Sequence, residues 1–465
     1  MARKYGLFPE LSTHEGFVSF GLDDGISDQW VLMGELAEYG RRRLVRFDVS
    51  KEKVVTVVGR RGQGKSYTLG AIVEGMCASV NTSISSIRRD KAVVLFDPLN
   101  IFQWTYIPLK QITNASKEYD NQVNLMQKWN LQSVPLNVQV WVPAGYRSKL
   151  YPSQYQDLYL SVSDFTLDDW AALMDIDIFR DIRGQYFNEL FNRVTKLGWE
   201  DKDENVHAAK SKYSIQDLIE CATNDIASGS GFFREETIRA VLQRLSSYGT
   251  HPVFSSTGTA LTEILKPGVL SIMLLNRLPE DLRMVLVAVL VRRIVAERAE
   301  ASENTKDLLL NPEMTLENRQ AKQEAVSHAI PRTWVVIDEI QSILPADTKT
   351  AATDTLVKTV KEGRNLGISF LSTTQQPRAV HQTVMSQTET FLIHRLVSQA
   401  DVEAVISNLK SQSPEEIKDE SRILKLQDLI REIPVGHVAV SDASSPRTFI
   451  MEVRPRISAH GGFET

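Results

Sequence analysis

The sequence is poor in cysteine and has no long uninterrupted apolar run. Cys77 and Cys221 are its only two cysteines, and both lie in apolar, helix-like surroundings, which argues against a disulfide framework or a cysteine-based metal site. The longest apolar stretch, residues 284–296, contains Arg292 and Arg293 and is shorter than the roughly 20 residues that cross a bilayer. The first residues, MARKYGLFPE, lack the apolar run of a secretory signal. We therefore expect a cytoplasmic protein without a membrane span.

The sequence also lacks an excess of positive charge. It has 53 Lys and Arg against 58 Asp and Glu, a net charge of −5, so it has no overall electrostatic attraction to nucleic acid. Because salt confines the effect of each charge to about 8 Å, DNA contact would have to be local, as in the basic pore of a ring. The contents of 42% hydrophobic and 24% charged residues are typical of a globular protein.

Apolar runs predict strands that alternate with helices, a pattern typical of a mainly parallel sheet. The predicted strands cover residues 54–58, 92–96, 138–142, 269–275, 334–337 and 368–371. Helical periodicity without strand signals fills residues 155–250, at 167–174, 179–197, 215–222 and 235–248. Residues 200–212 are charged, and residues 299–331 are polar with several helix-compatible stretches. Both segments are candidate exposed connections.

A motif typical of phosphate binding follows the first of these strands. It consists of Gly59, Arg60, Arg61, Gly62, Gln63, Gly64, Lys65 and Ser66, which fits the P-loop pattern G-x-x-x-x-G-K-S/T between a strand and a helix. Glycine lets backbone N–H groups converge on phosphate oxygens at the start of a helix. We predict that Lys65 contacts the β- and γ-phosphates of ATP, that Ser66 binds Mg²⁺, and that the adjacent Tyr67 belongs to the nucleotide-binding set.

Two acidic residues end the predicted strand at 334–337. Phosphoryl transfer needs a carboxylate on the Mg²⁺ side and a group that polarises the attacking water, so we assign Asp338 to Mg²⁺ and Glu339 as the general base. A further predicted strand runs into Gln375, at the edge where ligands bind in open α/β sheets. Gln375 is a candidate sensor of the γ-phosphate, and a polar turn before Pro377 is the alternative.

The series of motifs resembles the HerA/FtsK superfamily of P-loop motors, and HerA-type ATPases most closely. The resemblance covers most of residues 45–460 and is carried by the P-loop, by Asp338-Glu339 and by the stretch KEGRNLGISFLSTTQQPRAVHQTVMSQTETFLIHRL. It implies that Arg364 of KEGR reaches the ATP of the neighbouring subunit, where it would offset charge on the γ-phosphoryl group. It also implies that Asp97, in an aspartate–proline turn, lies near the site.

The resemblance has consequences for the termini and for three further arginines. The run from Arg454 to Gly462 is similar to a HerA tail that packs toward an adjacent protomer. Fewer than 60 residues precede Gly59, too few for the β-barrel with which HerA proteins usually begin. The resemblance also implies a final strand that includes residues 394–396, in which Arg395 is a candidate phosphate or interface contact, or a plain surface or structural arginine. Arg60 and Arg61 either present charge to a partner or are solvated loop residues.

The expected fold is an α/β, RecA-like P-loop NTPase core with a mainly parallel sheet and an inserted helical subdomain. We expect a short N-terminal segment at 1–45, the first half of the core at 46–150, the helical insertion at 151–265, the second half at 266–440 and a C-terminal tail at 441–465. Head-to-tail contacts that share the ATP site close into rings, and the resemblance implies a hexamer.

Two functions from different classes remain open at this stage. The first is an ATP-driven ring that translocates double-stranded DNA with a nuclease or other effector partner, in DNA processing or anti-phage defence. The second is an ATP-binding ring that organises an effector enzyme without moving along DNA. A DNA pump for conjugation or packaging is a third reading, disfavoured by the lack of membrane spans. DNA-stimulated ATPase activity distinguishes a motor from a scaffold.

Overall fold

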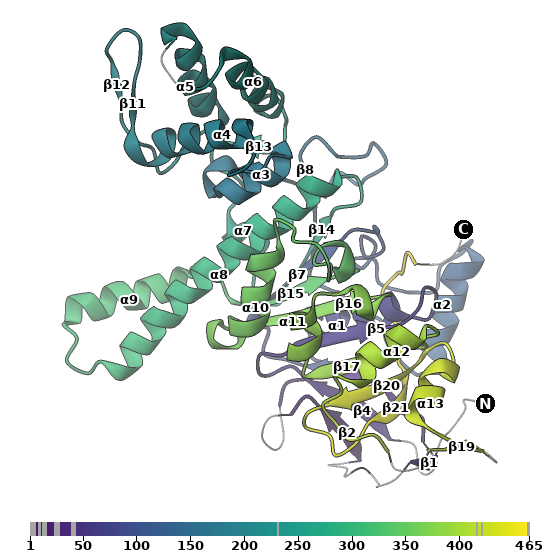
Figure 1. Cartoon of the computed structure of the whole chain (residues 1–465). Coiled ribbons are helices and arrows are strands. Elements are labelled where there is room, and N and C mark those ends of the chain that lie inside the picture. Colours follow the sequence, from purple (N-terminus) through teal and green to yellow (C-terminus); the bar gives the residue numbers. More distant parts are fainter. Residues whose placement is uncertain are drawn as a thin grey trace.

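One large β-sheet forms the centre of the protein, whose structure is a computed structural model (Figure 1). The structure describes residues 6–7, 11, 16–22, 28–38, 43–229, 232–414, 417–419 and 422–462. In order across the sheet, the strands are β2 (Phe17–Phe20), β4 (Leu44–Asp48), β3 (Trp30–Leu36), β21 (Phe449–Val453), β20 (His437–Asp442), β17 (Thr390–Ile393), β5 (Val54–Val58), β16 (Ile368–Thr374), β15 (Arg332–Ile337), β7 (Lys91–Asp97), β14 (Leu270–Leu274), β8 (Val138–Pro143) and β9 (Gln156–Leu158), with β6 (Ser85–Ser86) beside β3.

The strands from β17 to β9 are parallel, and they carry the predicted core of the fold. Strand β5, which leads into the P-loop motif, lies between β17 and β16. One strand, β16, therefore separates it from β15, the strand that is followed by Asp338 and Glu339. Strands β5, β15 and β16 are nearly continuous runs of buried residues, as expected for parallel strands covered on both faces. The expected RecA-like α/β core with its mainly parallel sheet is confirmed.

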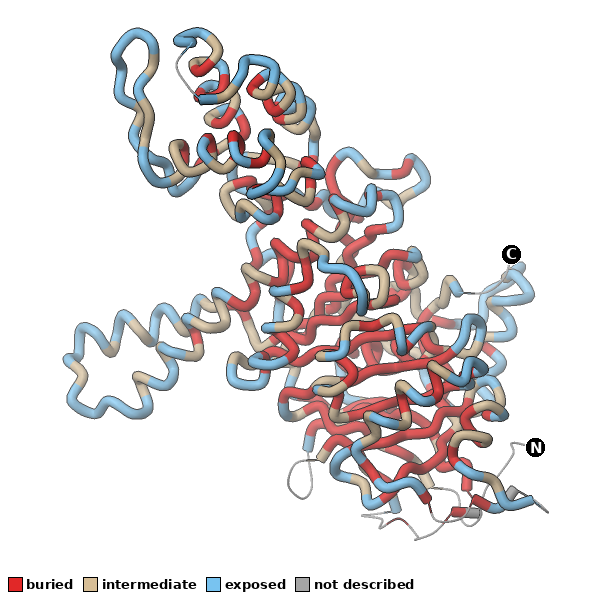
Figure 2. Tube along the Cα trace, viewed as in Figure 1, coloured by how far each residue is buried: buried red, intermediate tan, exposed pale blue. Residues whose placement is uncertain are grey.

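Alternate side chains of these strands enter two separate hydrophobic cores, because successive residues of a strand point to opposite faces. On one face, Val55 and Val57 pack with α1 (Lys65–Cys77). On the other face lie α8 (Glu280–Leu310), α10 (Thr353–Leu366), α11 (Gln382–Gln387) and α12 (Gln399–Ile406). Figure 2 shows the buried strands between these layers. The expected buried thiols are found, since Cys77 and Cys221 are both free and buried.

Strands from near both ends of the chain extend the same sheet. β21 pairs antiparallel with β20 on one side and with β3 on the other, and β3 pairs antiparallel with β4. A small separate sheet joins β1 (Gly6–Leu7) to β18 (Ile417–Asp419) and β19 (Arg422–Leu424). α2 (Lys117–Lys128) and α13 (Leu426–Glu432) complete the surface of this half of the molecule. Residues of the predicted N-terminal and C-terminal segments are therefore integral to the central sheet.

A helical subdomain stands away from the sheet (Figure 1). It contains α3 (Leu167–Met174), α4 (Ile182–Asn192), a π-helical turn (Arg193–Leu197), α5 (Ile215–Ser228) and α6 (Glu235–Gly249). The expectation that residues 155–250 contain no strands is wrong, because β9 extends the main sheet, β10 (Leu160–Ser161) pairs with β13 (Phe254–Ser255), and β11 (Trp199–Glu200) pairs with β12 (Val206–His207). These strands have two or three residues each, too short to produce a periodic sequence signal.

A second projection leaves the sheet after the short helix α7 (Leu261–Ile264) and strand β14. Helix α8 is buried along its first half and continues outward, where it turns back into α9 (Leu316–His328) (Figures 1 and 2). The polar segment 299–331 is thus largely two helices. Within the described residues, no helix is long and apolar enough to cross a membrane.

Candidate nucleotide-binding site

The P-loop motif connects β5 to α1 and is hydrogen-bonded to the end of β16 and to the segment that follows β17. Gly59 N donates to Thr374 O at 3.2 Å, and Arg60 N donates to Arg395 O at 2.9 Å. A Cβ at Gly59 would lie 2.5 Å from Cβ of His394, so only glycine fits there. Gly64, at the N-cap of α1, has φ of 101°, a conformation that glycine adopts readily. The sequence therefore builds a tight turn at a helix N-terminus, which favours anions.

The side chains of the P-loop differ in exposure in a way that fits phosphate binding. Lys65 is buried, with 4% of its surface exposed, whereas Arg60 and Arg61 are exposed. Gln63 and Ser66 are partly buried. Burial lowers the pKa of Lys65, although Glu339 and Asp338 oppose this shift. A buried ammonium next to convergent backbone dipoles is suited to hold a polyphosphate.

His394 packs against Gly59 and Gly64 of the P-loop. The sequence did not predict this contact. Its Nε2 atom lies 2.9 Å from Oγ1 of Thr68 in the first turn of α1. Burial lowers the pKa of His394 to about 3, and the positive charge of Lys65 contributes to the shift. The predicted strand at 394–396 is wrong: β17 ends at Ile393, so His394 and Arg395 are in the turn that contacts the P-loop. Arg395 is exposed and contacts the loop through its backbone.

Asp338 is fully buried where β15 ends beside the P-loop. Its Oδ1 atom accepts a hydrogen bond of 2.6 Å from Thr373 Oγ1 of β16. Among the polar side-chain atoms of the described residues, Asp338 Oδ2 is one of those buried without a hydrogen-bond partner. Burial raises the pKa of Asp338 to about 7, and the negative charges of Glu339 and Asp97 add to the rise. A buried carboxylate oxygen with no protein partner is a suitable ligand for a hydrated Mg²⁺.

Glu339 lies at the centre of a polar network. Its Oε1 accepts a hydrogen bond of 2.7 Å from Gln375 Nε2, and its Oε2 accepts one of 2.6 Å from Gln341 Nε2. Lys65 Nζ lies 3.7 Å from Oε1. The backbone of Glu339 is left-handed, with φ of 53° and ψ of 55°, a strained conformation for a non-glycine residue that often occurs at functional sites. Gln341, only two residues along the chain, was missed because a lone glutamine after an acidic pair carries no distinctive signal.

Asp97 ends β7, next to Asp338 on the neighbouring strand, and Asp338 N donates to Phe96 O at 3.2 Å. The carboxylate of Asp97 accepts backbone hydrogen bonds from Leu99 at 3.1 Å and Phe102 at 2.8 Å. Burial raises its pKa to about 6, opposed by these backbone donors. Asp97 therefore organises its own turn and adds negative charge beside Asp338.

Arg364 is remote from the P-loop of its own chain. It lies in the last turn of α10, just before the start of β16, and its side chain is 60% exposed, with Nη1 3.8 Å from Glu389 Oε1. The P-loop contacts the other end of β16, at Thr374. The seven residues of this strand span about 20 Å. Arg364 and the P-loop thus lie at opposite ends of β16.

Tyr67 connects the P-loop helix to the C-terminal segment. Its hydroxyl accepts a hydrogen bond of 2.9 Å from Arg456 N, and its ring packs against His460 with centroids 5.3 Å apart. Two helical turns further on, the buried Glu74 accepts hydrogen bonds from Arg454 Nη1 at 3.1 Å and Arg456 Nε at 2.9 Å. Burial alone would raise the Glu74 pKa, but the two arginines hold it below its usual range.

This network buries two arginines of the C-terminal run within their own chain. Arg454 and Arg456 are at most 1% exposed, so these side chains are not available to an adjacent protomer. Gly70 permits the contact, because a Cβ there would lie 2.6 Å from the Arg456 guanidinium carbon. The segment after β21 is therefore packed onto the helix that begins with Lys65 and Ser66.

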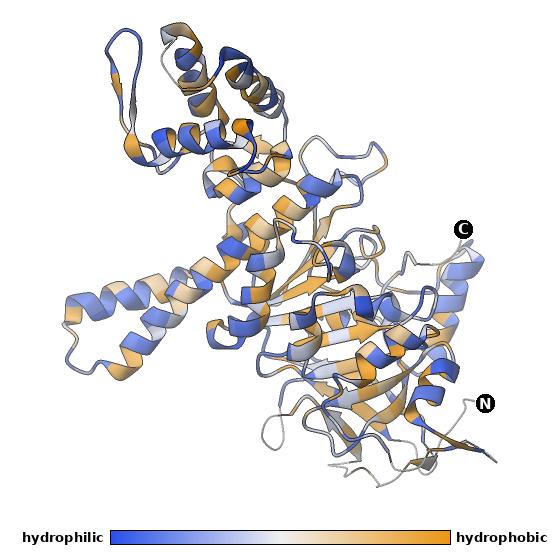
Figure 3. Ribbon diagram, in the orientation of Figure 1, coloured by the Kyte–Doolittle hydropathy of each residue, from blue (hydrophilic) through white to orange (hydrophobic). Residues whose placement is uncertain are grey.

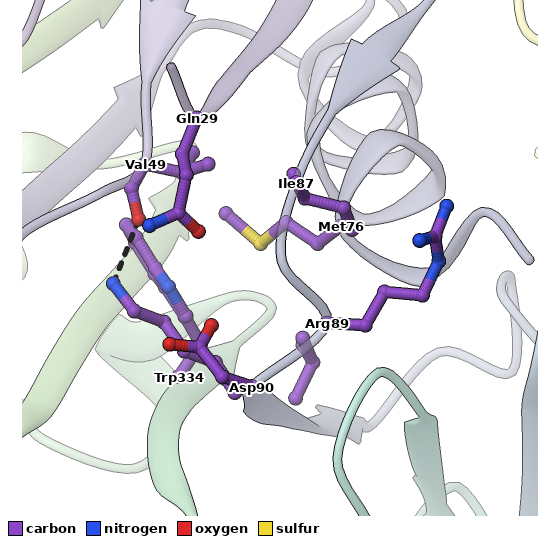
Figure 4. A pocket seen from close by; sticks show the side chains of 9 residues that line it. Gln29, Val49, Met76, Ile87, Arg89, Asp90 and Trp334 are labelled. Carbon is purple, nitrogen blue, oxygen red and sulfur yellow. Dashed lines mark hydrogen bonds between the residues drawn. The ribbon is translucent and has the colours of Figure 1, made fainter. Parts of the chain in front are cut away.

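A separate pocket lies around the start of β7 (Figure 4). It is lined by Gln29, Val49, Met76, Ile87, Arg89, Asp90, Lys91, Val93 and Trp334. Lys91 Nζ donates to the carbonyl oxygens of Val49 and Ser50, at 2.7 Å each. The lysine of this pocket is therefore hydrogen-bonded within the protein, and the lining residues include no glycine that could form a phosphate-binding turn.

The assembled geometry fits Mg²⁺·ATP. The P-loop turn, the buried Lys65 and the partly buried Ser66 lie on one side, and Asp338, Glu339 and Gln375 lie on the other. Bound Mg²⁺ would neutralise charge on the phosphates, and the residues placed to hold it are Ser66 and Asp338. The described residues contain no group of three or more His, Cys, Asp or Glu side chains arranged as a separate metal site.

Comparison with known proteins gives concordant matches. Residues 33–294, more than half of the chain, match the family described as "Helicase HerA, central domain". The DNA double-strand break repair helicase HerA of Sulfolobus acidocaldarius is 22% identical over 252 residues, which are 54% of this chain and 46% of that protein. The helicase of the same name from Pyrococcus furiosus is 23% identical over 194 residues, 40% of this chain and 35% of that protein. The chain thus spans half or less of the length of these curated relatives.

Two solved structures align over nearly the whole chain. VirB4 of Thermoanaerobacter pseudethanolicus aligns with a TM-score of 0.49 and 14% identity over 92% of this chain and 98% of that one. The bacterial conjugative coupling protein TrwB aligns with a TM-score of 0.48 and 13% identity over 100% of this chain and 99% of that one. On the match over residues 33–294, the chain belongs to the family of the HerA helicase central domain.

Proposed function

We propose that this protein is an ATP-driven motor that translocates double-stranded DNA. The observation that carries the proposal is the convergence of Lys65, Glu339 and Gln375, with Lys65 3.7 Å and Gln375 2.7 Å from the same carboxylate oxygen. Family membership and the names of the curated relatives, which are DNA double-strand break repair helicases, support DNA as the substrate.

In the proposed reaction, each residue has a separate task. The P-loop turn with Lys65 binds the β- and γ-phosphates, Ser66 and Asp338 hold Mg²⁺, and Glu339 accepts the proton of the attacking water. Gln375 and Gln341 fix the orientation of the Glu339 carboxylate through their amide N–H groups. Gln375 is placed to exchange this hydrogen bond for one to the γ-phosphate. The proposed nucleotide-binding region also includes Arg60, Arg61, Gly62, Gln63, Tyr67 and Asp97.

The position of Arg364 favours a shared site. An exposed arginine about 20 Å from its own P-loop cannot complete the site in its own chain, but it can reach a neighbour stacked head to tail. Such contacts close into rings, and we propose a hexamer with DNA in its pore. We also propose that the motor is cytoplasmic and works with a nuclease or other effector, in DNA processing or anti-phage defence.

We propose that the core comprises residues 46–150 and 266–440, with the helical insertion at 151–265 between its halves. On this division, residues 1–45 and 441–465 are a short N-terminal segment and a C-terminal tail, which contribute the strands β3 and β21 to the central sheet. A ring scaffold that organises an effector without translocation is the second candidate, favoured by the projecting helical subdomain and helical hairpin (Figure 1), which offer surfaces for a partner.

ATPase activity measured with and without linear duplex DNA tests the proposal, with Lys65→Ala as the inactive control. A motor should hydrolyse ATP several-fold faster when duplex DNA is present. The Lys65→Ala variant should not hydrolyse ATP, whether or not DNA is present. Displacement of a triplex-forming strand from the duplex then reports translocation directly. ATP hydrolysis that is indifferent to DNA, with no strand displacement, would favour the scaffold.

A further inference from the structure

A helical hairpin, here called the arm, presents leucines to solvent at its tip. The arm consists of residues 302–328, the outer part of α8 and all of α9. Leu309, Leu310 and Leu316 are 77%, 78% and 79% exposed, and none of the residues of α9 is buried. Figure 3 shows hydrophobic colour near the turn of an otherwise mainly hydrophilic projection. Exposed apolar groups at the end of such a projection mark a contact surface.

Polar contacts hold the two helices of the arm in a defined geometry. Lys322 Nζ donates to Asn304 Oδ1 at 3.0 Å and lies 3.1 Å from Asp307 Oδ2. Arg319 donates to the carbonyl oxygens of Leu308 at 3.4 Å and Asn311 at 3.3 Å. The leucines are therefore presented by a preorganised element, which reduces the entropy lost on binding.

The root of the arm is attached to the turn that carries Arg364. Ser302 Oγ donates to Asn365 O at 3.0 Å, and Arg298 Nε donates to Leu366 O at 2.9 Å. These acceptors are the two residues directly after Arg364. From Ser302, the nine residues to the end of α8 extend about 13 Å. A surface that approaches Arg364 therefore comes within reach of the arm.

The size of the tip indicates what binds there. A stable interface needs roughly 20–30 residues on each side, and three leucines are far too few to hold a separate partner. The tip must add to a contact that other residues supply. The adjacent exposed surface at Arg364 is the one proposed above to face a second copy of this chain.

We propose that the arm binds a second copy of this chain and clasps the same subunit interface that Arg364 enters. This inference rests on the proposed shared ATP site and adds to it a surface that takes no part in the chemistry. The leucines pack on the neighbour, while the hydrogen bonds at the root couple that contact to the position of Arg364. Assembly and arginine placement are thereby linked.

The test is the variant Leu309→Gln/Leu310→Gln/Leu316→Gln, studied by sedimentation velocity with Mg²⁺ and a non-hydrolysable ATP analogue. The concentration for half-assembly should rise at least about tenfold, as for loss of apolar contacts at an interface. The matched control is Phe179→Gln/Leu197→Gln/Val206→Gln, three apolar residues of the helical subdomain that are 81%, 77% and 80% exposed. It should assemble like the unmodified chain. Both variants should keep the native melting temperature, because all six side chains are at the surface.

Cross-linking identifies the occupant. Leu316→Cys carries a reactive thiol, whereas Cys77 and Cys221 are buried, so a photoactivatable maleimide will label the tip. In a mixture of ¹⁵N-labelled and unlabelled chains, cross-linked peptides should contain one chain of each kind. If the chain assembles but the leucine variant assembles equally well and cross-links stay within one chain, the arm inference fails and the ring proposal stands. A chain that remains monomeric with nucleotide overturns both.

Discussion

Lys65 Nζ and Glu339 Oε1 lie 3.7 Å apart, and the two side chains are only 4% and 7% exposed. The group assigned to bind phosphate and the group assigned as the base therefore share one buried ion pair. Phosphate binding competes with Glu339 for the lysine, so arrival of ATP would redistribute the contacts of the base as well.

Glu339→Gln should bind Mg²⁺·ATP at least as tightly as the unmodified protein and hydrolyse it at least about a hundredfold more slowly. The amide cannot accept the proton of water, and it releases Lys65 from its ion pair. Nucleotide titration and steady-state phosphate release measure the two effects. Asp354→Asn, at an acid whose side chain is 71% exposed, is the control and should change neither. Near-normal turnover in Glu339→Gln would move the base elsewhere.

Arg364→Ala should bind ATP normally and lose hydrolysis by about a thousandfold or more, the range for a finger arginine. Mixed with inactive Lys65→Ala chains, it should regain part of the activity, because some interfaces then pair an intact P-loop with an intact Arg364. Arg239→Ala, which removes an arginine with 63% exposure in the helical subdomain, should remain active. Monomeric and active Arg364→Ala would contradict a shared site.

The buried His394 should make stability depend on pH. Its pKa in the folded state is about 3, against an ordinary value near 6.5, so the unfolded chain binds a proton below pH 6.5 that the folded chain refuses. The free energy of unfolding should therefore fall as pH drops from 6.5 toward 3, by up to about 1.4 kcal/mol per pH unit for this proton. His394→Gln should reduce that slope in urea titrations. His328→Gln, at an exposed position in α9, should leave it unchanged.

Glu74→Gln should lower the free energy of unfolding by about 3–5 kcal/mol, because it leaves two buried arginines without their counter-charge. The guanidinium groups of Arg454 and Arg456 would keep their burial and lose the carboxylate they share. Chemical denaturation measures the loss. The control is Glu235→Gln, which breaks an exposed pair with Arg239 and should cost at most about 1 kcal/mol. Equal effects of the two variants would show that the buried network adds little.

The sequence was sufficient for those parts of the fold and site that depend on local chemistry. A β-branched run followed by Gly59 and Lys65 specifies a strand, a turn and the start of a helix. The acidic pair at 338–339 follows an apolar run, 334–337, that predicts a buried strand. Asp338 and Glu339 could be placed opposite the P-loop because carboxyl ends of parallel strands share one edge.

The contacts that escaped prediction are those between distant segments. His394 reaches Thr68 across 326 positions of sequence, and Arg456 reaches Glu74 across 382. Neither partner has a composition or spacing that reveals the other, since a lone histidine or a charged pair in a tail is compatible with a solvated surface. The sequence of the arm predicted an exposed connection with helix-compatible stretches, but not a helical hairpin. Helix α9 has no buried face, and periodicity detects a helix through such a face.

The pairing of β3 with β21 joins Leu36 to Met451, so an early segment of the chain finds its neighbour only after nearly all of the polypeptide has been made. Synthesis at about 5–20 residues per second leaves β3 without this partner for some tens of seconds. During that interval one side of β3 remains a template for strand addition. Because β4 pairs with the other side of β3, we expect newly made chains to depend on a holding factor to avoid aggregation before β21 closes the sheet.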